Sequence, residues 1–334
     1  MTWVVTGGAG YIGSHVVRAF ADEGIESVVL DDLSTGREVF VPDGIEVVQG
    51  SITDAAAVSA VLRRPDVEGV VHIAALKYAG VSVAEPLDFY RVNVEGTRTL
   101  LEECRSAGVG NVVFSSSAAV FGTPDVELVT ESTAKSPESP YGESKLIGEW
   151  LLADVARAVQ LAGGAPFRHT SLRYFNVVGS GSPTVYDVSP HNLFPLLLAA
   201  VTEGRTPKVF GDDYATPDGS CVRDYIHVSD VASAHVAAAR ALAAGGDLAP
   251  AYNLGRGEGV SVKEIIGAFA DVLGRPVPYD VGPRRPGDPD RIVTSAAKAE
   301  TELGWKADRD LHDMVASAWE SWNQATLAGT ARLG

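Results

Sequence analysis

Tyr141 and Lys145 are the first candidates for chemistry, because they lie four residues apart in the segment Tyr-Gly-Glu-Ser-Lys. In a helix this spacing places both side chains on one face. A free tyrosine has a pKa of about 10, so it acts as a base near neutral pH only where a neighbouring cation stabilises its phenolate. Lys145 can supply that charge. The same spacing is common on surface helices, so the pair indicates a proton acceptor only together with other signals.

Ser117 is the third candidate and lies just past an apolar run at 111–114, in the segment Phe-Ser-Ser-Ser-Ala-Ala-Val-Phe-Gly. Open α/β sheets bind their ligands outside the carboxyl ends of the strands. A hydroxyl at that place can hydrogen-bond a reacting oxygen and pass its proton to Tyr141. For Ser115 and Ser116 we expect structural roles in a turn.

The elements that must position these residues follow from the hydrophobic pattern. From residue 2 to about 175, short β-branched runs alternate with longer segments of helical period. Strands are expected near 2–6, 26–31, 45–49, 67–73, 109–115 and 168–174. This alternation predicts an α/β fold with a Rossmann-type doubly wound parallel sheet.

The pattern changes after Asn176, where loops rich in Gly and Pro separate shorter helices expected near 229–244, 260–273 and 310–326. A smaller mixed α/β C-terminal substrate lobe is therefore expected. We predict a Rossmann domain over 1–175 and the substrate lobe over 176–334, with segments near 229–248 packing back on the first domain.

A glycine-rich turn follows the first expected strand, with Gly7, Gly10 and Gly13 in Gly-Gly-Ala-Gly-Tyr-Ile-Gly. Such glycines allow a tight turn and the close approach of a pyrophosphate to the helix that follows. Asp31 ends the second strand, where an acid accepts hydrogen bonds from ribose hydroxyls and repels a 2′-phosphate. NAD rather than NADP is the predicted cofactor, and Arg37 is expected to be a solvated loop charge.

The composition of the 334-residue chain limits the other partners. Its net charge of −16, from 27 basic and 43 acidic residues, disfavours nucleic acid. It contains neither a long apolar run nor a secretory signal pattern, so we expect no membrane association. Cys104 and Cys221 lack metal or disulfide spacing, which predicts no metal site and a cytoplasmic protein.

The motifs taken together resemble the extended short-chain dehydrogenase/reductases, and in particular the UDP-glucose/UDP-galactose 4-epimerase family. The resemblance runs nearly from end to end. It is carried by V-T-G-G-A-G-Y-I-G-S-H, L-D-D-L-S, L-K at 76–77, N-V-E-G-T, S-S-S-A-A-V-F-G, S-P-Y-G-E-S-K, L-R-Y-F-N, H-N-L-F-P, C-V-R-D-Y-I-H-V, Y-N-L-G and R-R-P-G-D.

The resemblance implies a set of site residues and makes the C-terminal lobe a UDP-sugar-binding lobe. The implied catalytic residues are Ser117, Tyr141 and Lys145. The implied cofactor-binding residues are Gly7, Gly10, Tyr11, Ile12, Gly13, Asp31, Ser51, Ile52, Lys77, Asn93, Tyr141, Lys145 and Tyr174, the last beside the nicotinamide. The implied substrate-binding residues are Ser117, Asn176, Asn192, Phe210 against the uracil, Arg223, Tyr225, Arg285, Asp288 and Ile292.

Three positions depart from the family pattern. Ser51 stands where an acid that binds adenine is common. Phe121 replaces a usual tyrosine, and Ala75 replaces a common glycine before Leu76. The last two changes are expected near the pocket, and neither touches the proposed acid–base group.

The implied reaction is 4-epimerisation of UDP-glucose and UDP-galactose through a 4-keto sugar, with tightly bound NAD. A 4,6-dehydratase is disfavoured, because Ala118 and Ala119 stand where that class carries an Asp-Glu pair. Epimerisation of the GDP-fucose-synthase type is disfavoured because the Cys/His pair is missing.

Some alternatives stay open. Ile292 occupies a position where the family varies in size, so UDP-N-acetylhexosamines or UDP-glucuronate remain possible substrates. A non-catalytic NAD-binding regulator is the alternative from another class. The family also implies a homodimer packed through helices near 87–106 and 139–161, although the apolar positions there fit core packing equally well.

Overall fold

The computed structural model describes residues 2–285, 287–331 and 333, and its largest feature is a seven-stranded sheet with parallel pairings throughout. The strand order is β10-β6-β5-β4-β1-β2-β3. The strands span β1 Thr2–Thr6, β2 Glu26–Asp31, β3 Glu46–Gln49, β4 Val67–His72, β5 Asn111–Ser117, β6 Arg168–Tyr174 and β10 Ala251–Leu254. The first six agree with the predicted strands, which confirms the doubly wound fold. The four-residue β10 is not among those predicted.

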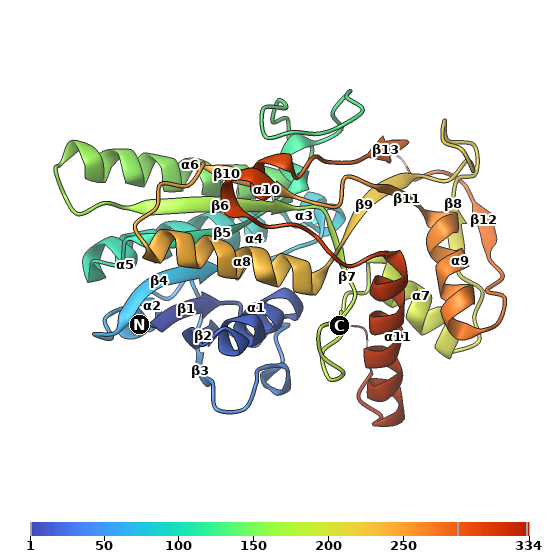
Figure 1. The fold of residues 1–334 in the computed structure, drawn as a ribbon, viewed down its shortest axis with the longest axis horizontal. Helices are drawn as coiled ribbons and strands as arrows, with labels where there is room; N and C mark the ends of the chain where they lie inside the picture. Colours follow the sequence, from blue (N-terminus) through green and yellow to red (C-terminus); the bar gives the residue numbers. More distant parts are fainter. Residues whose placement is uncertain (1, 286, 332, 334) are drawn as a thin grey trace.

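Helices cover both faces of the sheet, because successive strand residues point to opposite sides. Val5 packs on one face in a core shared with α1 and α8, and Val4 packs on the other with α2, α5 and α6. Figure 1 shows these layers. The helices span α1 Tyr11–Asp22, α2 Ala55–Leu62, α5 Gly96–Ala107, α6 Pro140–Leu161 and α8 Val228–Ala243.

The start of α6 is set by two adjacent residues. The Ser139 side chain accepts a hydrogen bond from the Gly142 amide at 3.2 Å, and Pro140 takes the first helical position. A serine cap followed by proline is a strong helix start. Tyr141 therefore lies in the first turn of α6.

The helix expected over 87–106 is continuous but irregular. It consists of α4 (Pro86–Phe89), a π-helical turn (Tyr90–Glu95) and α5. Such turns often mark functional sites, and this one carries Asn93. The short helix α3 (Ala79–Ala84) precedes it.

The smaller region lies at the right of Figure 1 and contains two small sheets. Strand β9 pairs in parallel with β7 and β13 and antiparallel with β11, while β8 pairs with β12. Its core includes Phe194, Phe269 and Met314. The elements span β7 Asn176–Val178, α7 Leu193–Thr202, β8 Lys208–Phe210, β9 Val222–His227, β11 Gly259–Ser261, α9 Val262–Leu273, β12 Asp280–Gly282, β13 Arg291–Ile292 and α11 Leu311–Leu327.

Several elements beyond residue 175 lie against the large sheet. Strand β10 pairs with β6, α8 packs against α1, and α10 (Ala297–Leu303) contacts both β10 and α8. The division of function between residues 1–175 and 176–334 stays a prediction.

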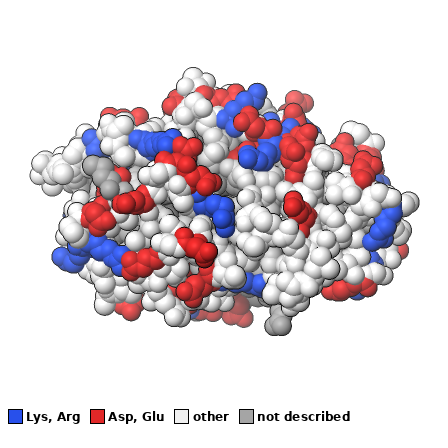
Figure 2. Space-filling model, turned by 60° about the horizontal axis from the view of Figure 1, so that its bottom comes forward, with Lys and Arg blue, Asp and Glu red and all other residues white. Residues whose placement is uncertain are grey.

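The surface carries both signs of charge. On the face shown in Figure 2, acidic side chains lie among basic ones. Among the described residues, no helix is both long and apolar enough to cross a membrane.

Candidate active site

Ser117, Tyr141 and Lys145 meet at the carboxyl edge of the large sheet. Ser117 ends β5, and its side chain lies close enough to the Tyr141 hydroxyl to lower the pKa of Tyr141. Lys145 lies one turn further along α6, where its Nζ donates to the Ser115 carbonyl at 2.8 Å and lies 6.0 Å from the centroid of the Tyr141 ring. The three candidates therefore form one cluster, although their catalytic roles remain a prediction.

The electrostatics of this cluster depend on burial. Burial raises the pKa of Tyr141, while the Ser117 hydrogen bond and the charge of Lys77 lower it, and the net shift is upward. Lys145 is 5% exposed, and burial lowers its pKa to about 7. Lys77 is thus a cation that favours the Tyr141 phenolate, a role that the sequence pattern did not indicate.

Ser115 and Ser116 do not form a turn, and that expectation is wrong. Strand β5 continues to Ser117, so both lie within the sheet. The Ser115 hydroxyl hydrogen-bonds the Tyr174 hydroxyl on β6, and the Ser116 hydroxyl donates to Glu149 on α6. Ser115 therefore orients Tyr174, the residue predicted to lie beside the nicotinamide.

The glycine turn leaves no room for side chains. Gly7 has φ +72°, and a Cβ there would lie 2.7 Å from the Ala74 amide nitrogen. A Cβ on Gly13 would lie 2.0 Å from the Gly7 carbonyl oxygen. Gly10 caps α1 without a side-chain hydrogen bond, so the first amides of the helix can bind an anion.

Asp31 lies beside this turn at the end of β2. Its Oδ2 accepts from the Ala9 amide and its Oδ1 from the Leu33 amide, each at 2.9 Å. Burial raises the pKa of Asp31, and these two hydrogen bonds oppose the rise. The carboxylate is thus fixed next to the pyrophosphate cradle, and the arrangement fits a dinucleotide.

Asn93 holds a loop. Its Oδ1 accepts from the Leu76 amide at 2.8 Å, and its Nδ2 donates to the Leu76 carbonyl at 3.0 Å and to the Ser144 hydroxyl at 3.0 Å. It therefore positions the segment that carries Lys77. Direct contact of Asn93 with the cofactor remains a prediction.

Four further predicted cofactor residues surround the cradle. The Tyr11 hydroxyl donates to the Gly179 carbonyl at 2.6 Å, and Ile12 is half-buried. The Ser51 hydroxyl hydrogen-bonds Thr53 at 2.9 Å, and Ile52 is buried. Their contacts with NAD stay predictions.

Strand β9 gathers the predicted substrate residues of the smaller region. It carries Arg223 and Tyr225, with Asn176 of β7 opposite Tyr225 and Ile292 of β13 opposite Arg223. The Arg223 guanidinium donates to the Asp288 carboxylate. Burial raises the pKa of Tyr225, so its hydroxyl stays neutral at physiological pH.

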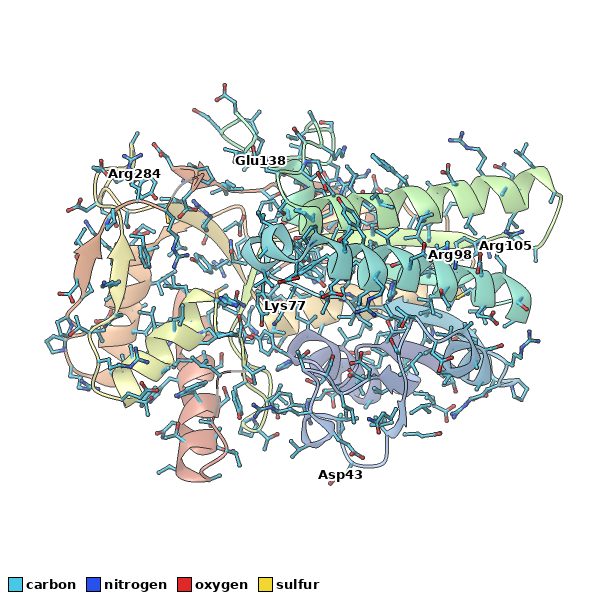
Figure 3. The ribbon with its side chains drawn as sticks, turned by 180° about the vertical axis from the view of Figure 1, so that it is seen from behind. Asp43, Lys77, Arg98, Arg105, Glu138 and Arg284 are labelled. Carbon is cyan, nitrogen blue, oxygen red and sulfur yellow. The ribbon has the colours of Figure 1, made fainter. Side chains whose placement is uncertain are left out.

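A second pair joins the end of β8 to the loop after β12. The guanidinium of Arg285 stands 4.2 Å from the centroid of the Phe210 ring, a cation–π distance. Asn192, at the start of α7, donates to Asp187 at 2.8 Å. In Figure 3, Lys77 lies at the junction of the large sheet and this region.

Residues 3–255 match the NAD dependent epimerase/dehydratase family. The chain belongs to that family. The UDP-glucose 4-epimerase of Azospirillum brasilense is 41% identical over 338 residues, covering 99% of this chain and 94% of the relative. A crystal structure of a UDP-glucose 4-epimerase has a TM-score of 0.92 at 39% identity and 98% coverage of both chains. The enzyme of Brucella ovis in complex with NAD has a TM-score of 0.89 at 40% identity, covering 95% of this chain and 97% of that chain.

In this NAD-dependent epimerase/dehydratase, Phe121 and Ile292 belong to one apolar cluster. Phe121, with Val120, Val129 and Leu146, forms a small core against which Ile292 packs. The side chain of Ile292, predicted to affect sugar choice, is therefore backed by this cluster.

Other residues of this family member are brought to the site only by the tertiary structure. Glu149 accepts from Ser116 and from the buried Arg173. Asp187 lies 3.6 Å from Lys77. Asp187 is in a loop without a motif, so the sequence carried no signal for it.

Proposed function

We propose that the protein interconverts UDP-glucose and UDP-galactose by inverting carbon 4 of the sugar through a 4-keto sugar. The observation that carries this proposal is the meeting of Ser117, at the end of β5, with Tyr141 and Lys145 in the first turns of α6, where Lys145 Nζ lies 6.0 Å from the centroid of the Tyr141 ring. The names of the similar proteins support the same reaction.

Tyr141 acts as the proton acceptor. Its phenolate takes the proton of the 4-hydroxyl, directly or through Ser117, which gives its own proton to Tyr141 as it receives that of the sugar. Lys77 and Lys145 stabilise the phenolate, which burial alone would disfavour. Gly7, Gly13 and Asp31 would hold NAD, which would supply a reversible hydride acceptor for carbon 4, so that no net oxidation would occur.

The smaller region holds the nucleotide while the sugar turns. Arg223 and Arg285 suit a diphosphate, because a guanidinium donates paired hydrogen bonds to phosphate oxygens. Phe210, beneath Arg285, offers a flat surface for the uracil. The 4-keto sugar rotates about its diphosphate linkage. Tyr141 then returns a proton to the oxygen on carbon 4, which becomes the new 4-hydroxyl.

Elimination of water has no acid–base pair to support it. Ala118 and Ala119 follow Ser117 directly in a 3-10 turn spanning Ala118–Phe121. Neither methyl group can donate or accept a proton, so these two positions cannot assist elimination of water from the keto sugar. This favours epimerisation over dehydration.

We infer a homodimer formed through the layer of α5 and α6, which run side by side with Arg98 and Arg105 marking α5 in Figure 3. Trp150 on α6 and the neighbouring Val83 and Leu87 are 58%, 65% and 79% exposed, and burial of these apolar side chains in an interface would favour association. The free thiols Cys104 and Cys221 support a cytoplasmic location. The proposed reaction would place the protein in galactose metabolism.

One assay tests the reaction. Purified protein loaded with NAD is incubated with UDP-galactose and no added cofactor, and UDP-glucose is measured. Formation of UDP-glucose at catalytic turnover is expected, and its absence from cofactor-loaded protein would refute the proposal. Parallel assays with the N-acetylhexosamine and glucuronate forms measure the sugar range.

A further inference from the structure

Asp187 lies between the two halves of the candidate site, and its side chain is 9% exposed. Its Oδ1 accepts from the Ser189 amide at 3.0 Å and lies 3.6 Å from Lys77 Nζ. Its Oδ2 accepts from Asn192 Nδ2 at 2.8 Å. The Asp187 carboxylate thus contacts both Lys77, the cation that acts on Tyr141, and Asn192, whose side chain is predicted to bind the substrate.

A second contact joins the same two segments. The Tyr78 and His191 rings pack edge to face, with centroids 4.7 Å apart. Tyr78 has φ +89°, a conformation that non-glycine residues rarely adopt. Such backbone persists where the surrounding contacts hold it, so the loop that carries Lys77 is held against the loop that carries Asp187.

Lys77 interacts electrostatically with both Tyr141 and Asp187. Its charge lowers the pKa of Tyr141. Burial lowers the pKa of Lys77 itself, but Asp187, Tyr78 and Tyr141 together raise it above its usual value. The ammonium group is therefore shared between the proton acceptor and Asp187.

We propose that Asp187 is a positioning residue that couples the acid–base centre to the UDP-sugar site, by holding Lys77 on one side and Asn192 on the other. Because Asn192 belongs to the proposed substrate site, this coupling rests on the proposed function. Its role is assigned through Lys77 and Asn192 and not through a contact of its own with the reacting atoms.

The coupling has a consequence for pH dependence. The ionisable groups that face Tyr141 are Lys145 from α6, Tyr174 from the end of β6 and Lys77 from the loop after β4. In Asp187→Asn the amide oxygen can still accept a hydrogen bond from Lys77 and hold it in place, but the charge of Lys77 is no longer opposed, so the phenolate becomes more stable and the pKa of Tyr141 falls. The acid limb of kcat/KM should move to lower pH by roughly half a unit.

The test uses NAD-loaded protein and two readouts. Calorimetric titration with UDP should show affinity about fivefold to tenfold weaker in Asp187→Asn. Asn192→Ala should weaken it similarly, and the double variant should bind no more weakly than either single variant. In a Lys77→Met background, Asp187→Asn should no longer move the acid limb.

Two further variants separate the effect of the Asp187 charge from the effect of its position and from a general loss of stability. Asp187→Glu retains the charge, so its acid limb should stay in place while UDP binding weakens. Asp310→Asn is the matched control, because Asp310 also accepts a backbone amide but caps α11, and it should change neither readout. Additive losses in the double variant, or an unmoved limb in Asp187→Asn, would overturn the coupling. The UDP titration needs no turnover, so failure of the epimerase proposal would be seen separately.

Discussion

The large sheet and the smaller region hold their functional side chains in different ways. At the sheet, Ser117 ends a strand, and Tyr141 and Lys145 occupy the first turns of a helix packed on its core. In the smaller region, Arg223 lies on a strand, but Arg285 and Asp288 lie in a loop and Asn192 is exposed. The reacting centre is thus built on rigid elements and the binding surface partly on loops.

The difference matches the two tasks of the proposed reaction. Proton transfer requires donor and acceptor within hydrogen-bond distance, so a small displacement is costly. A sugar that turns over between two half-reactions requires a firm hold on the nucleotide and few contacts with the hexose. Changes at the sheet should therefore affect turnover, and changes in the smaller region should affect substrate affinity.

The largest effect is expected from Tyr141→Phe. Removal of the hydroxyl eliminates the proton acceptor but keeps the ring packed against Phe89, so turnover should fall roughly a thousandfold while NAD stays bound. Conversion of UDP-galactose and the NAD content of the purified protein measure both. Tyr279→Phe, at an exposed tyrosine, serves as the control. Turnover within tenfold of the parent would contradict the role of Tyr141.

Arg223→Leu tests the expectation that changes in the smaller region affect substrate affinity. Loss of its charged hydrogen bonds should raise the KM for UDP-galactose about tenfold to a hundredfold, with kcat changed only a few-fold. Steady-state kinetics separate the two constants. Arg205→Leu removes an exposed arginine of the same region that pairs with Glu203, and it should leave KM alone. A fall in kcat without a change in KM would place Arg223 in the reacting centre instead.

Asp31→Asn should weaken NAD retention about tenfold. A carboxamide offers one acceptor oxygen, so the Ala9 and Leu33 amides and the ribose can no longer all be served. Loss of the negative charge should also reduce discrimination against NADP. Equilibrium dialysis measures both cofactors, and Asp32→Asn, at the exposed neighbouring acid, is the control. Equal retention of NAD in Asp31→Asn and the parent would refute the assignment.

The smallest effect concerns Lys145 and stability. Its folded pKa of about 7 lies below the unfolded value of about 10.4, so between these values the unfolded chain binds more protons. Its contribution to the free energy of unfolding therefore rises with pH across this window, by up to about 1.4 kcal/mol per pH unit. Below pH 7 both states are protonated and the cost of burying the charge is complete.

Lys145→Met should remove this rise. Denaturant unfolding of NAD-free protein at pH 7.5 and 8.5 should give a difference between parent and variant that changes by about 1 kcal/mol. Lys208→Met, at an exposed lysine, should leave the pH dependence as it is. Parallel curves for the parent and Lys145→Met would show that Lys145 is already neutral or never desolvated.

Much of the fold could be predicted because its signals are local. Six strands of the large sheet follow from β-branched runs such as Val28-Val29-Leu30, which are buried on both faces. Strand β10 could not be predicted in the same way, since four residues carry little periodicity and pair with β6 only after the chain has crossed the smaller region. The irregular helix at 86–107 was predicted in position but not in its π-helical turn.

The sequence by itself determined the chemistry available at the site. The spacing of Tyr141 and Lys145 is set by the helical period, and Gly7 and Gly13 are required because no side chain fits there. Only the tertiary structure decided which distant residues contact the site residues. Tyr174 hydrogen-bonds Ser115, Arg223 donates to Asp288, and Asp187 pairs with Lys77. Parallel strands end at one common edge, so residues far apart in the chain meet there, and no local pattern records that meeting.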